Sequence, residues 1–400
     1  MIPRSKKLTR DEAKSHNQRL VLRLIYQHGE FSRADIARAS GLTRTTASAV
    51  VSELMEQGLV QEIGQGPSAG GKPPTLLQVR PDARHLIGVD LAGTTLEGAV
   101  FDLRGRAVHR ASVEFDLNRN QDALEQVLDL LDRLVVEASQ PLLGIGIGLP
   151  GLINSQLGVV YHALSLGWPQ LALGDILRQR YQVPVYLVND SQGAALAEYT
   201  FAREENIHDM AVILVAQGVS AGIILNGQLY RGRLHSGASE IGHLRVMEEG
   251  FPCVCGHEGC LETIVGERAV LQGARTIYAR RPDSALGRLV RRSEEITMAT
   301  VAEAYRQGDP PVMALGAEMS YYLGIAAANL HAVLNVPRIV LAGGVAGFGD
   351  SFAAAVEAQI RERTLPWLAD RVKVRPSTLD DDTVELGAAA VLLANELGVV

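Results

Sequence analysis

Three cysteines stand close together in a 400-residue chain that has no others. They are Cys253, Cys255 and Cys260, in the stretch CVCGHEGC. An odd number of thiols in so short a stretch does not suit a disulfide framework and favours metal or redox chemistry. Two histidines are close enough in sequence to join them, His243 ahead of the cysteines and His257 between them. The spacing alone leaves either histidine as the fourth ligand.

The length of the chain is enough for two or three domains with a large hydrophobic core. The first ten residues are polar and basic and no apolar run follows them, so we expect no signal peptide. No stretch of the length that spans a bilayer is free of charged residues. The sequence therefore predicts a cytoplasmic protein with no membrane segment.

Charge is distributed unevenly along the chain. Residues 1–80 hold twelve Lys and Arg against seven Asp and Glu, a net charge of +5. The remaining residues hold 26 against 38, a net charge of −12. A basic module attached to an acidic body is typical of a DNA-binding domain joined to a second function. A basic tail in solvent would give the same balance, so charge alone does not decide.

The basic region carries three helical patterns in quick succession. The first covers residues 16–28, with its apolar residues on one face. The second opens at Ser32, an N-cap residue, and ends near Gly41. The third opens at Thr43 and stops at Gly58. Two short helices joined by a tight turn with glycine indicate a helix-turn-helix.

The third helix has a buried apolar stripe that leaves its N-terminal polar residues free for DNA. Strands expected at 59–63 and 75–79 flank a glycine-rich loop, which has the form of a wing. A plain three-helix bundle would show the same caps, but the basic balance and the hairpin favour DNA binding. The expected DNA contacts are Arg44, Thr45, Thr46, Ser48 and, at the tip of the wing, Lys72.

The rest of the chain repeats one pattern. Apolar strands at 86–91 and 96–103 precede a helix at 122–137 and a strand at 142–149, and the pattern restarts at 211–216. Glycine-bearing turns follow the strands as DLAGTT (90–95), QGVSAG (217–222) and AGGVAG (342–347). Their backbone amides can hold phosphate, and Asp90 can hold Mg²⁺ through water. The repeat predicts two related α/β lobes of an actin-like, ATP-binding scaffold.

The stretch VYLVNDSQG places two polar residues between a strand and a helix. Asn189 and Asp190 stand at the start of that helix, where its amides can hold a carboxylate. Asp190 is therefore placed to accept a hydrogen bond from a substrate hydroxyl or to take its proton. The alternative is that it only caps the helix.

From residue 86 to its end, the chain resembles the ROK family, which groups bacterial sugar kinases with sugar-responsive repressors, and the winged helix fits the repressors. The family's E-x-G-H and C-x-C-G-x-x-G-C-L-E motifs stand here as Glu240-Ile-Gly-His243 and as Cys253 to Glu262. The resemblance implies an N-terminal winged helix-turn-helix followed by a two-lobed α/β actin-like ATPase body of the sugar-kinase type. The expected domains are 1–82, the first lobe at 83–195 and the second lobe at 196–382, with a C-terminal helix at 383–400 packing back on the first lobe.

The resemblance also implies the site. It favours His243 over His257, so that His243, Cys253, Cys255 and Cys260 form a closed Cys₃His site for structural Zn²⁺. The second ring nitrogen of His243 then faces a sugar. The expected sugar-binding residues are Asn189, Asp190, Glu240, His243 and Glu262.

The phosphate-binding turns depart from the kinase pattern. Thr95 stands where the kinases' D-x-G-G-T-K has lysine, Gln217 replaces a threonine in the second turn, and Ser165 replaces an asparagine that contacts sugar. Losing a charged contact to a transferring phosphoryl group lowers the rate on the order of a thousandfold. No catalytic residue is therefore assigned with certainty, and Asp190 is the base only if the chain is a kinase.

These features predict a sugar-sensing transcriptional regulator, a repressor of carbohydrate uptake or catabolism genes that leaves its operator DNA when a sugar or sugar phosphate binds between the lobes. We expect a homo-oligomer, a dimer or tetramer, with helices around 302–322 as a candidate contact. One alternative is an ATP-dependent sugar kinase with a fused DNA-binding domain. The other is a sensor whose winged helix docks on a protein.

Overall fold

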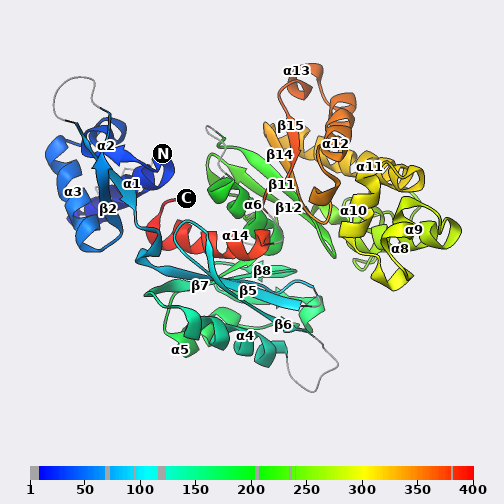
Figure 1. Ribbon diagram of the computed structural model, residues 1–400, viewed down its shortest axis with the longest axis horizontal. Coiled ribbons are helices and arrows are strands. Elements are labelled where there is room, and N and C mark those ends of the chain that lie inside the picture. Colours follow the sequence, from blue (N-terminus) through cyan, green and yellow to red (C-terminus); the bar gives the residue numbers. More distant parts are fainter. Residues whose placement is uncertain are drawn as a thin grey trace, which may run out of the picture.

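The computed structural model describes residues 9–67, 73–93, 95–115, 123–202, 207–233, 237–238, 240–379 and 382–400. A three-stranded sheet lies in the N-terminal domain, and two five-stranded sheets form the lobes of the body. The N-terminal domain sits beside the C-terminus at one end of the molecule, and the second lobe lies at the other end (Figure 1). Within the described ranges, no helix is both long and apolar enough to cross a bilayer.

The N-terminal domain is the predicted winged helix-turn-helix. Ser32 caps the second helix, Gly41 ends it with a φ of 70°, and Thr43 caps the third. The wing tip with Lys72 lies outside the described residues. The elements are α1 Arg10–His28, β1 Phe31–Ser32, α2 Arg33–Ser40, α3 Arg44–Glu56, β2 Val60–Gln65 and β3 Thr75–Val79.

The first helix is longer than its apolar stripe indicates. It begins at Arg10, whereas the stripe predicts a start at His16. A capping box fixes the earlier start, because the Thr9 side chain accepts from the backbone of Glu12 and the Glu12 carboxylate accepts from the backbone of Thr9. The two extended residues of β1 pair with β3 and complete a sheet in the order β1-β3-β2.

The first lobe is built on the sheet order β10-β7-β4-β5-β6. The strands β5 and β6 are antiparallel to their neighbours, whereas β7 and β10 run parallel to β4. Helix α4 covers one face, and the C-terminal helix α14 covers the other. The elements are β4 His85–Asp90, β5 Thr95–Phe101, β6 Ala107–Glu114, α4 Ala123–Glu137, β7 Leu142–Leu149, β8 Leu152–Asn154, β9 Val159–His162, α5 Leu173–Tyr181, β10 Val185–Asn189 and α14 Thr383–Leu392.

Glycines let α14 lie directly on this sheet. In the strand LLGIGIGL, the isoleucines point into the core beneath α4, and the glycines alternate with them on the other face. A Cβ on Gly146 would lie 1.9 Å from the carbonyl oxygen of Ala388, and one on Gly88 would lie 2.0 Å from that of Glu385. Any larger side chain would therefore push the helix off the sheet.

The second lobe repeats the topology of the first. Its sheet has the order β13-β12-β11-β14-β15, with antiparallel strands on one side of β11 and parallel strands on the other. This confirms the predicted duplication. The elements are β11 Met210–Val215, β12 Val219–Leu225, β13 Gln228–Leu229, α7 Glu262–Val265, α8 Glu267–Arg280, α9 Ala285–Leu289, α10 Met298–Arg306, α11 Pro310–Leu334, β14 Arg338–Gly343, α12 Asp350–Arg363, α13 Pro366–Ala369 and β15 Lys373–Pro376.

Helix α6, Asp190–Phe201, connects the two lobes. It packs on β11 and β12 of the second lobe and on α14, which belongs to the first (Figure 1). The two helices cross so closely that a Cβ on Gly387 would lie 2.0 Å from the carbonyl oxygen of Gly193. The boundary between the two lobes that we expected from the sequence after residue 195 lies inside this helix.

The C-terminus binds to the DNA-binding domain. A π-helical turn, Leu393–Leu397, follows α14. Just beyond it, the carbonyl of Gly398 accepts from Arg23 Nε of α1 at 2.9 Å, and Glu396 accepts from the hydroxyl of Tyr186 at 2.6 Å. Buried side chains of α1, α3, β3, β4 and α14 share one hydrophobic core across this seam.

Candidate functional site

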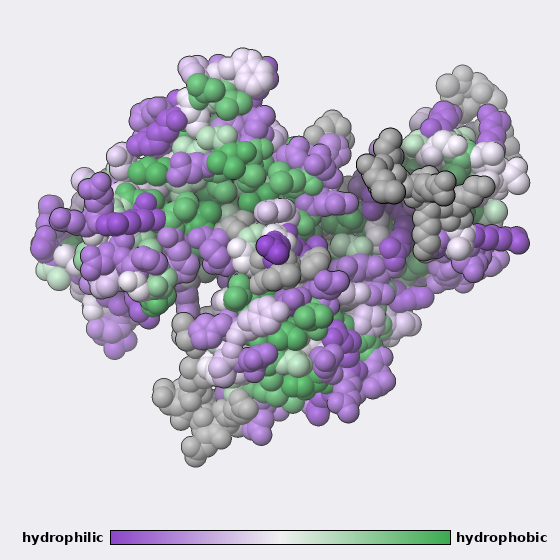
Figure 2. Space-filling view, turned by 180° about the vertical axis from the view of Figure 1, so that it is seen from behind, coloured by the Kyte–Doolittle hydropathy of each residue, from purple (hydrophilic) through white to green (hydrophobic). Residues whose placement is uncertain are grey.

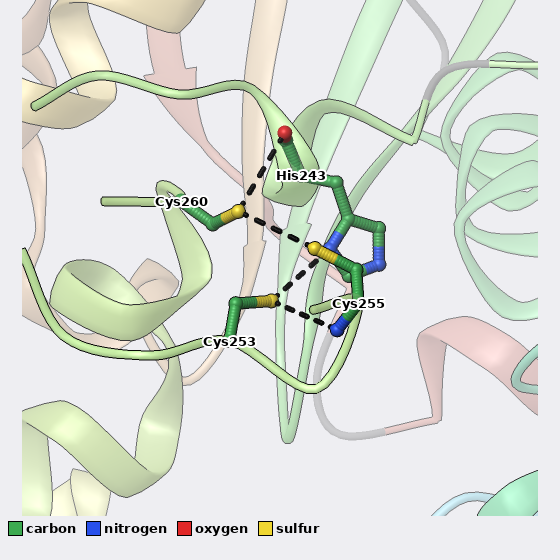
Figure 3. Close-up of side chains that lie close together, drawn as sticks. All are labelled: His243, Cys253, Cys255 and Cys260. Carbon is green, nitrogen blue, oxygen red and sulfur yellow. Dashed lines mark hydrogen bonds between the residues drawn. The ribbon is translucent and has the colours of Figure 1, made fainter. Parts of the chain in front are cut away.

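The three cysteines and His243 converge on one point (Figure 3). Cys253 Sγ lies 3.4 Å from His243 Nδ1, Cys255 Sγ lies 3.6 Å from Cys260 Sγ, and the four ligand atoms all lie within 4.8 Å of one another. Tetrahedral ligands at zinc distances stand about 3.5–3.8 Å apart. The donor set and its spacing therefore fit a four-coordinate metal ion with soft ligands.

Local backbone geometry brings the thiols together. The backbone N–H of Cys253 donates to the carbonyl of His257 at 2.8 Å and closes a tight turn. Gly259 has a φ of 71°, and a Cβ there would lie 2.3 Å from the carbonyl oxygen of Met247. The turn that presents Cys260 therefore requires glycine at this position.

His257 is not part of the cluster. Its Nδ1 lies 3.4 Å from Cys255 Sγ, but the group of four mutually close ligand atoms contains His243 instead. His243 sits in a short 3₁₀ turn, Ile241–His243, ahead of the cysteine loop. Because its Nδ1 faces the thiols, its Nε2 is turned away from them (Figure 3).

Protonation of the thiols opposes metal binding. Burial raises the pKa of Cys253, and the carboxylate of Glu262, which accepts from its Sγ at 2.8 Å, raises it further. Burial also raises the pKa of Cys260. Backbone hydrogen bonding by His257 lowers the pKa of Cys255 to about 6. A metal ion that binds here must therefore displace protons from thiols that burial keeps protonated.

The acidic residues expected to bind sugar lie next to the metal cluster. Glu262 begins α7, and its Oε1 is 3.6 Å from His243 Nδ1. Burial raises the pKa of Glu240, an effect that the charge of His243 opposes and that of Glu262 reinforces. Burial raises the pKa of Asp190 to about 6, and Glu240 adds to this. Asp190, Glu240, His243 and Glu262 thus act on one another electrostatically, although they come from three separate segments.

Asn189 serves its own helix as well. Its Oδ1 accepts from the backbone N–H of Ser191 at 3.1 Å and from the Ser191 hydroxyl at 2.7 Å, so it is the N-cap of α6. Its Nδ2 donates to the carbonyl of Gly151 at 3.4 Å. The side chain is buried, and these bonds hold it in place beside Asp190.

Two of the expected phosphate-binding turns differ from the prediction. The second turn is shorter, because β12 begins at Val219 and only residues 216–218 lie between the strands. In the third, β14 continues to Gly343, where a Cβ would lie 2.3 Å from the carbonyl oxygen of Val215. The glycine at this position is explained by packing at the sheet edge. In the first turn, Asp90 accepts from the backbone N–H of Ala92 at 2.8 Å, and Thr94 lies outside the described residues.

Four of the five expected DNA contacts lie in the N-terminal half of α3, and the fifth, Lys72, lies outside the described residues. Arg44 and Thr45 are exposed, whereas Thr46 and Ser48 are half-buried. The Thr46 hydroxyl lies 2.8 Å from that of the cap residue Thr43. Arg44 and Thr45 are therefore the residues of this set most available to DNA.

Two further residues extend this face. Ala49 and Ser52 are exposed, and they follow Thr45 at helical spacings of four and seven. The same period in the sequence could have identified them. No ion pair involves Arg44 in the part of the chain that the structure describes, whereas Arg38 of α2 pairs with Asp35.

A winged helix-turn-helix joined to a duplicated body of the sugar-kinase type defines the class: a DNA-binding domain fused to a sugar-kinase-like scaffold. The profile of the ROK family matches residues 86–395, and that of the MarR family matches residues 15–67. The chain therefore belongs to the ROK family.

Its relatives include proteins of both kinds. The sequence is 30% identical over 390 residues to the xylose repressor of Caldicellulosiruptor bescii, covering 96% of this chain and 97% of the repressor. A crystal structure of a ROK family transcriptional regulator, described as a homologue of the E. coli MLC protein, is similar with a TM-score of 0.80, 25% identity and coverage of 97% and 98%. A ROK glucokinase from Streptomyces griseus, solved with glucose and AMPPNP, matches 77% of this chain and 98% of its own, with a TM-score of 0.67 and 28% identity.

Proposed function

We propose that the protein is a sugar-responsive transcriptional repressor that acts in the cytoplasm as a homo-oligomer. The observation that carries the proposal is the combination of an exposed recognition helix with a polar shell beside a metal cluster, in a chain that matches a named repressor over nearly its whole length. The glucokinase match covers 77% of this chain, whereas the repressor match covers 96% of it. A difference of this size is what a kinase without an N-terminal DNA-binding domain would give. That domain is the part a kinase does not need.

The ion in the cluster is Zn²⁺ in this proposal. Three thiolates and one imidazole suit its ligand preference and fill a tetrahedron, so the site is structural and leaves no position for a reacting water. Through His243 Nδ1, the ion fixes the ring whose Nε2 is turned away from the thiols. The zinc therefore orients His243 toward the effector.

The effector is a sugar that Asp190, Glu240, His243 and Glu262 bind through its hydroxyl groups, with Asn189 holding Asp190 in place. Carboxylates and an imidazole discriminate between hydroxyl positions, because a mismatched epimer leaves a buried polar group unpaired. Asp190 stands at the start of α6, between the lobes. A sugar bound here would change how the lobes close.

Phosphoryl transfer is the weaker candidate. Asp190 is placed as a base, but Thr95 and Gln217 replace expected phosphate contacts. Acidic side chains also surround Asp90, with Glu97 opposite it in the β4–β5 ladder. Carboxylates that are ionised at this position would repel a polyphosphate. We expect isothermal titration with millimolar Mg-ATP to show no binding, and clear nucleotide binding with sugar phosphorylation would revive the kinase function.

An oligomer contact is supported by apolar side chains exposed on the second lobe. Figure 2 shows apolar surface gathered over this lobe. The exposed apolar residues on α11 and around α13 are Met313, Tyr321, Val333, Leu365 and Trp367. Two copies joined through such a face would present two recognition helices to a palindromic operator.

The test is fluorescence anisotropy of the zinc-loaded protein on DNA from upstream of its own gene, at fixed salt and with a panel of free and phosphorylated sugars. We expect specific binding that one sugar weakens. Arg44→Ala should weaken operator binding by about 1–3 kcal/mol, whereas Arg361→Ala, an arginine of α12, should not. Operator binding that no sugar alters would refute the sensing function, and an Arg44→Ala variant with full affinity would favour protein docking.

A further inference from the structure

A cavity of about 470 Å³ lies at the seam between the DNA-binding domain and the first lobe. It is lined by the end of α1, by β3 and the turn after it, by the β5–β6 turn and by the end of α6. Small-molecule sites commonly have volumes of about 300–1,000 Å³. The cavity shares no residue with the metal cluster. It also shares none with the sugar shell, as we call the proposed sugar-binding residues Asn189, Asp190, Glu240, His243 and Glu262.

One wall of the cavity is rigid. The Arg104 guanidinium donates to the carbonyl of Tyr26 at 2.7 Å and lies over its ring, 4.5 Å from the centroid. The Tyr26 hydroxyl donates to the carbonyl of Leu103 at 2.8 Å. Gly105 closes the turn with a φ of 76°, and a Cβ there would lie 2.6 Å from the ring of Phe201. The β5–β6 turn is therefore held between α1 and α6.

The charges that line the cavity favour an anion. The residues that line the cavity include two arginines, Arg104 and Arg106, and one carboxylate, that of Glu30. The C-terminal end of α1 adds a partial negative charge, which Arg104 offsets by donating to the Tyr26 carbonyl. Arg106 is exposed, and among the described residues its side chain has no ion-pair or hydrogen-bond partner. Its guanidinium is therefore available to a ligand.

A buried hydroxyl also lines the cavity. Thr200 Oγ1 is inaccessible to solvent and has no hydrogen-bond partner in the part of the chain that the structure describes. A buried polar atom without a partner is destabilising, so its presence in a native structure calls for an explanation, such as a bound water, ion or ligand. Arg106 and Thr200 line the same cavity, which suits a ligand with an anionic group and further polar atoms.

We propose that this cavity is a second effector site and that it binds a small organic phosphate. The Arg106 guanidinium would bind the phosphate, since its planar fork matches phosphate oxygens in a bidentate manner. Thr200 and Gln78 would bond the hydroxyl or carbonyl groups of the organic part. The proposal goes beyond the function proposed above, because binding here requires neither the sugar shell nor DNA.

The position of the cavity would let such a ligand affect the DNA-binding domain and the sugar shell. Helix α6 starts at Asp190 in the sugar shell and ends at Phe201 in the cavity wall. The opposite wall is the end of α1, part of the DNA-binding domain. A ligand that binds more tightly at one separation of these two walls would shift the DNA-binding domain toward the position that gives this separation.

The test uses the zinc-loaded full-length protein without DNA, titrated calorimetrically with glucose 6-phosphate, fructose 1,6-bisphosphate and inorganic phosphate. We expect one organic phosphate to bind with one equivalent per chain. Arg106→Gln should weaken that binding roughly tenfold or more, and Thr200→Val should weaken it less. Both changes spare the folded core, because Arg106 is exposed and valine removes only an unpaired hydroxyl.

Two matched variants make the test decisive. Glu240→Gln alters the sugar shell and Arg361→Gln removes a distant arginine, and we expect neither to change phosphate binding at the seam. Loss of binding in Glu240→Gln would assign the ligand to the sugar shell and overturn the proposal. So would equal affinity in Arg106→Gln, or no binding of any probe at millimolar concentration. If Arg106→Gln weakened only operator binding, the arginine would contact DNA phosphate and the cavity would not be an effector site.

Discussion

Glu385 shows at the residue scale what surrounds Asp90 in the first glycine-bearing turn. It lies in the first turn of α14 with 3% of its surface exposed, and its Oε2 has no hydrogen-bond partner among the described residues. Burial raises the pKa of Glu385 to about 7, and it raises the pKa of Asp90 well above its ordinary value. The neighbouring Arg110 pairs with Asp382 in a bidentate arrangement. Burial thus favours the protonated, uncharged form of the Glu385 and Asp90 carboxyl groups near neutral pH.

Glu385→Gln should flatten the dependence of stability on pH. The pKa of Glu385 is raised on folding, so the unfolded state ionises first and the free energy of unfolding falls as pH rises from about 4.5 to 7. The loss is at most about 3 kcal/mol. Chemical unfolding at pH 5 and pH 8 measures it, with Glu318→Gln, an exposed residue of α11, as the control. An equal loss in wild type and Glu385→Gln would assign the effect to another buried carboxyl group, such as that of Asp90.

The two histidines near the cysteines have different expected roles. His243→Ala should release the metal and lower the melting temperature, because three thiols then remain for a four-coordinate ion. His257→Ala should retain one equivalent of zinc. Metal content by mass spectrometry after dialysis measures both. Since metal binding displaces protons from the cysteines, zinc affinity should rise with pH. Zinc loss from His257→Ala alone would reverse the assignment.

At the scale of elements, glycine decides how closely helix and sheet approach. Gly88 and Gly146 place the backbone of α14 on β4 and β7, and Gly193 and Gly387 let α6 cross α14. Local propensity gives no reason for glycine in a strand, where it weakens pairing. Glycine is required in these strands because the backbone of α14 packs directly against that face of the sheet.

Gly146→Ala should destabilise the protein by about 1–3 kcal/mol or prevent folding, because its Cβ would overlap the backbone of α14. Gly273→Ala is the matched control in α8, where the nearest atom is the end of the Leu315 side chain at 3.1 Å. A helical alanine there should be neutral or stabilising by up to about 1 kcal/mol. Denaturant unfolding compares the two, and similar midpoints would contradict the packing argument.

At the scale of the whole molecule, the lobes and the DNA-binding domain meet through two helices. Helix α6 carries Asp190 at one end, and α14 continues into the turn whose Gly398 carbonyl accepts from Arg23 of α1. A sugar bound between the lobes and an operator bound to α3 can therefore act on the same conformational equilibrium, that between two arrangements of the lobes and the DNA-binding domain. The coupling between them is a single free energy and must be reciprocal.

The reciprocity gives a quantitative prediction. If the effector weakens operator affinity by some factor, saturating operator should weaken effector affinity by the same factor. Removing residues 396–400 should reduce that factor toward one while the body still binds sugar, because the contact of the C-terminus with α1 is lost. Titrations of each ligand with and without the other measure it. Unchanged coupling in the truncated chain would show that the contact between the C-terminus and α1 does not carry the coupling.

The sequence by itself determined the features that depend on neighbouring residues. Ser32, Gly41 and Thr43 predicted the helix-turn-helix because caps and turns are local. The repeated pattern of strands and helices along the chain predicted two lobes. The cysteine motif indicated a metal site because it too is local. The start of α1 and the true length of the second phosphate turn were missed, since a capping box and strand pairing override hydrophobic patterning.

Only the tertiary structure decided which distant residues meet. Asp90 and Glu385 are almost three hundred residues apart in sequence, and their proximity depends on α14 returning to the first sheet. The seam cavity likewise joins the end of α1 to the end of α6. Spacing and periodicity describe what a segment does with its neighbours, whereas contacts between segments follow from packing of the whole chain. The acidic face and the cavity therefore had no signal in the sequence.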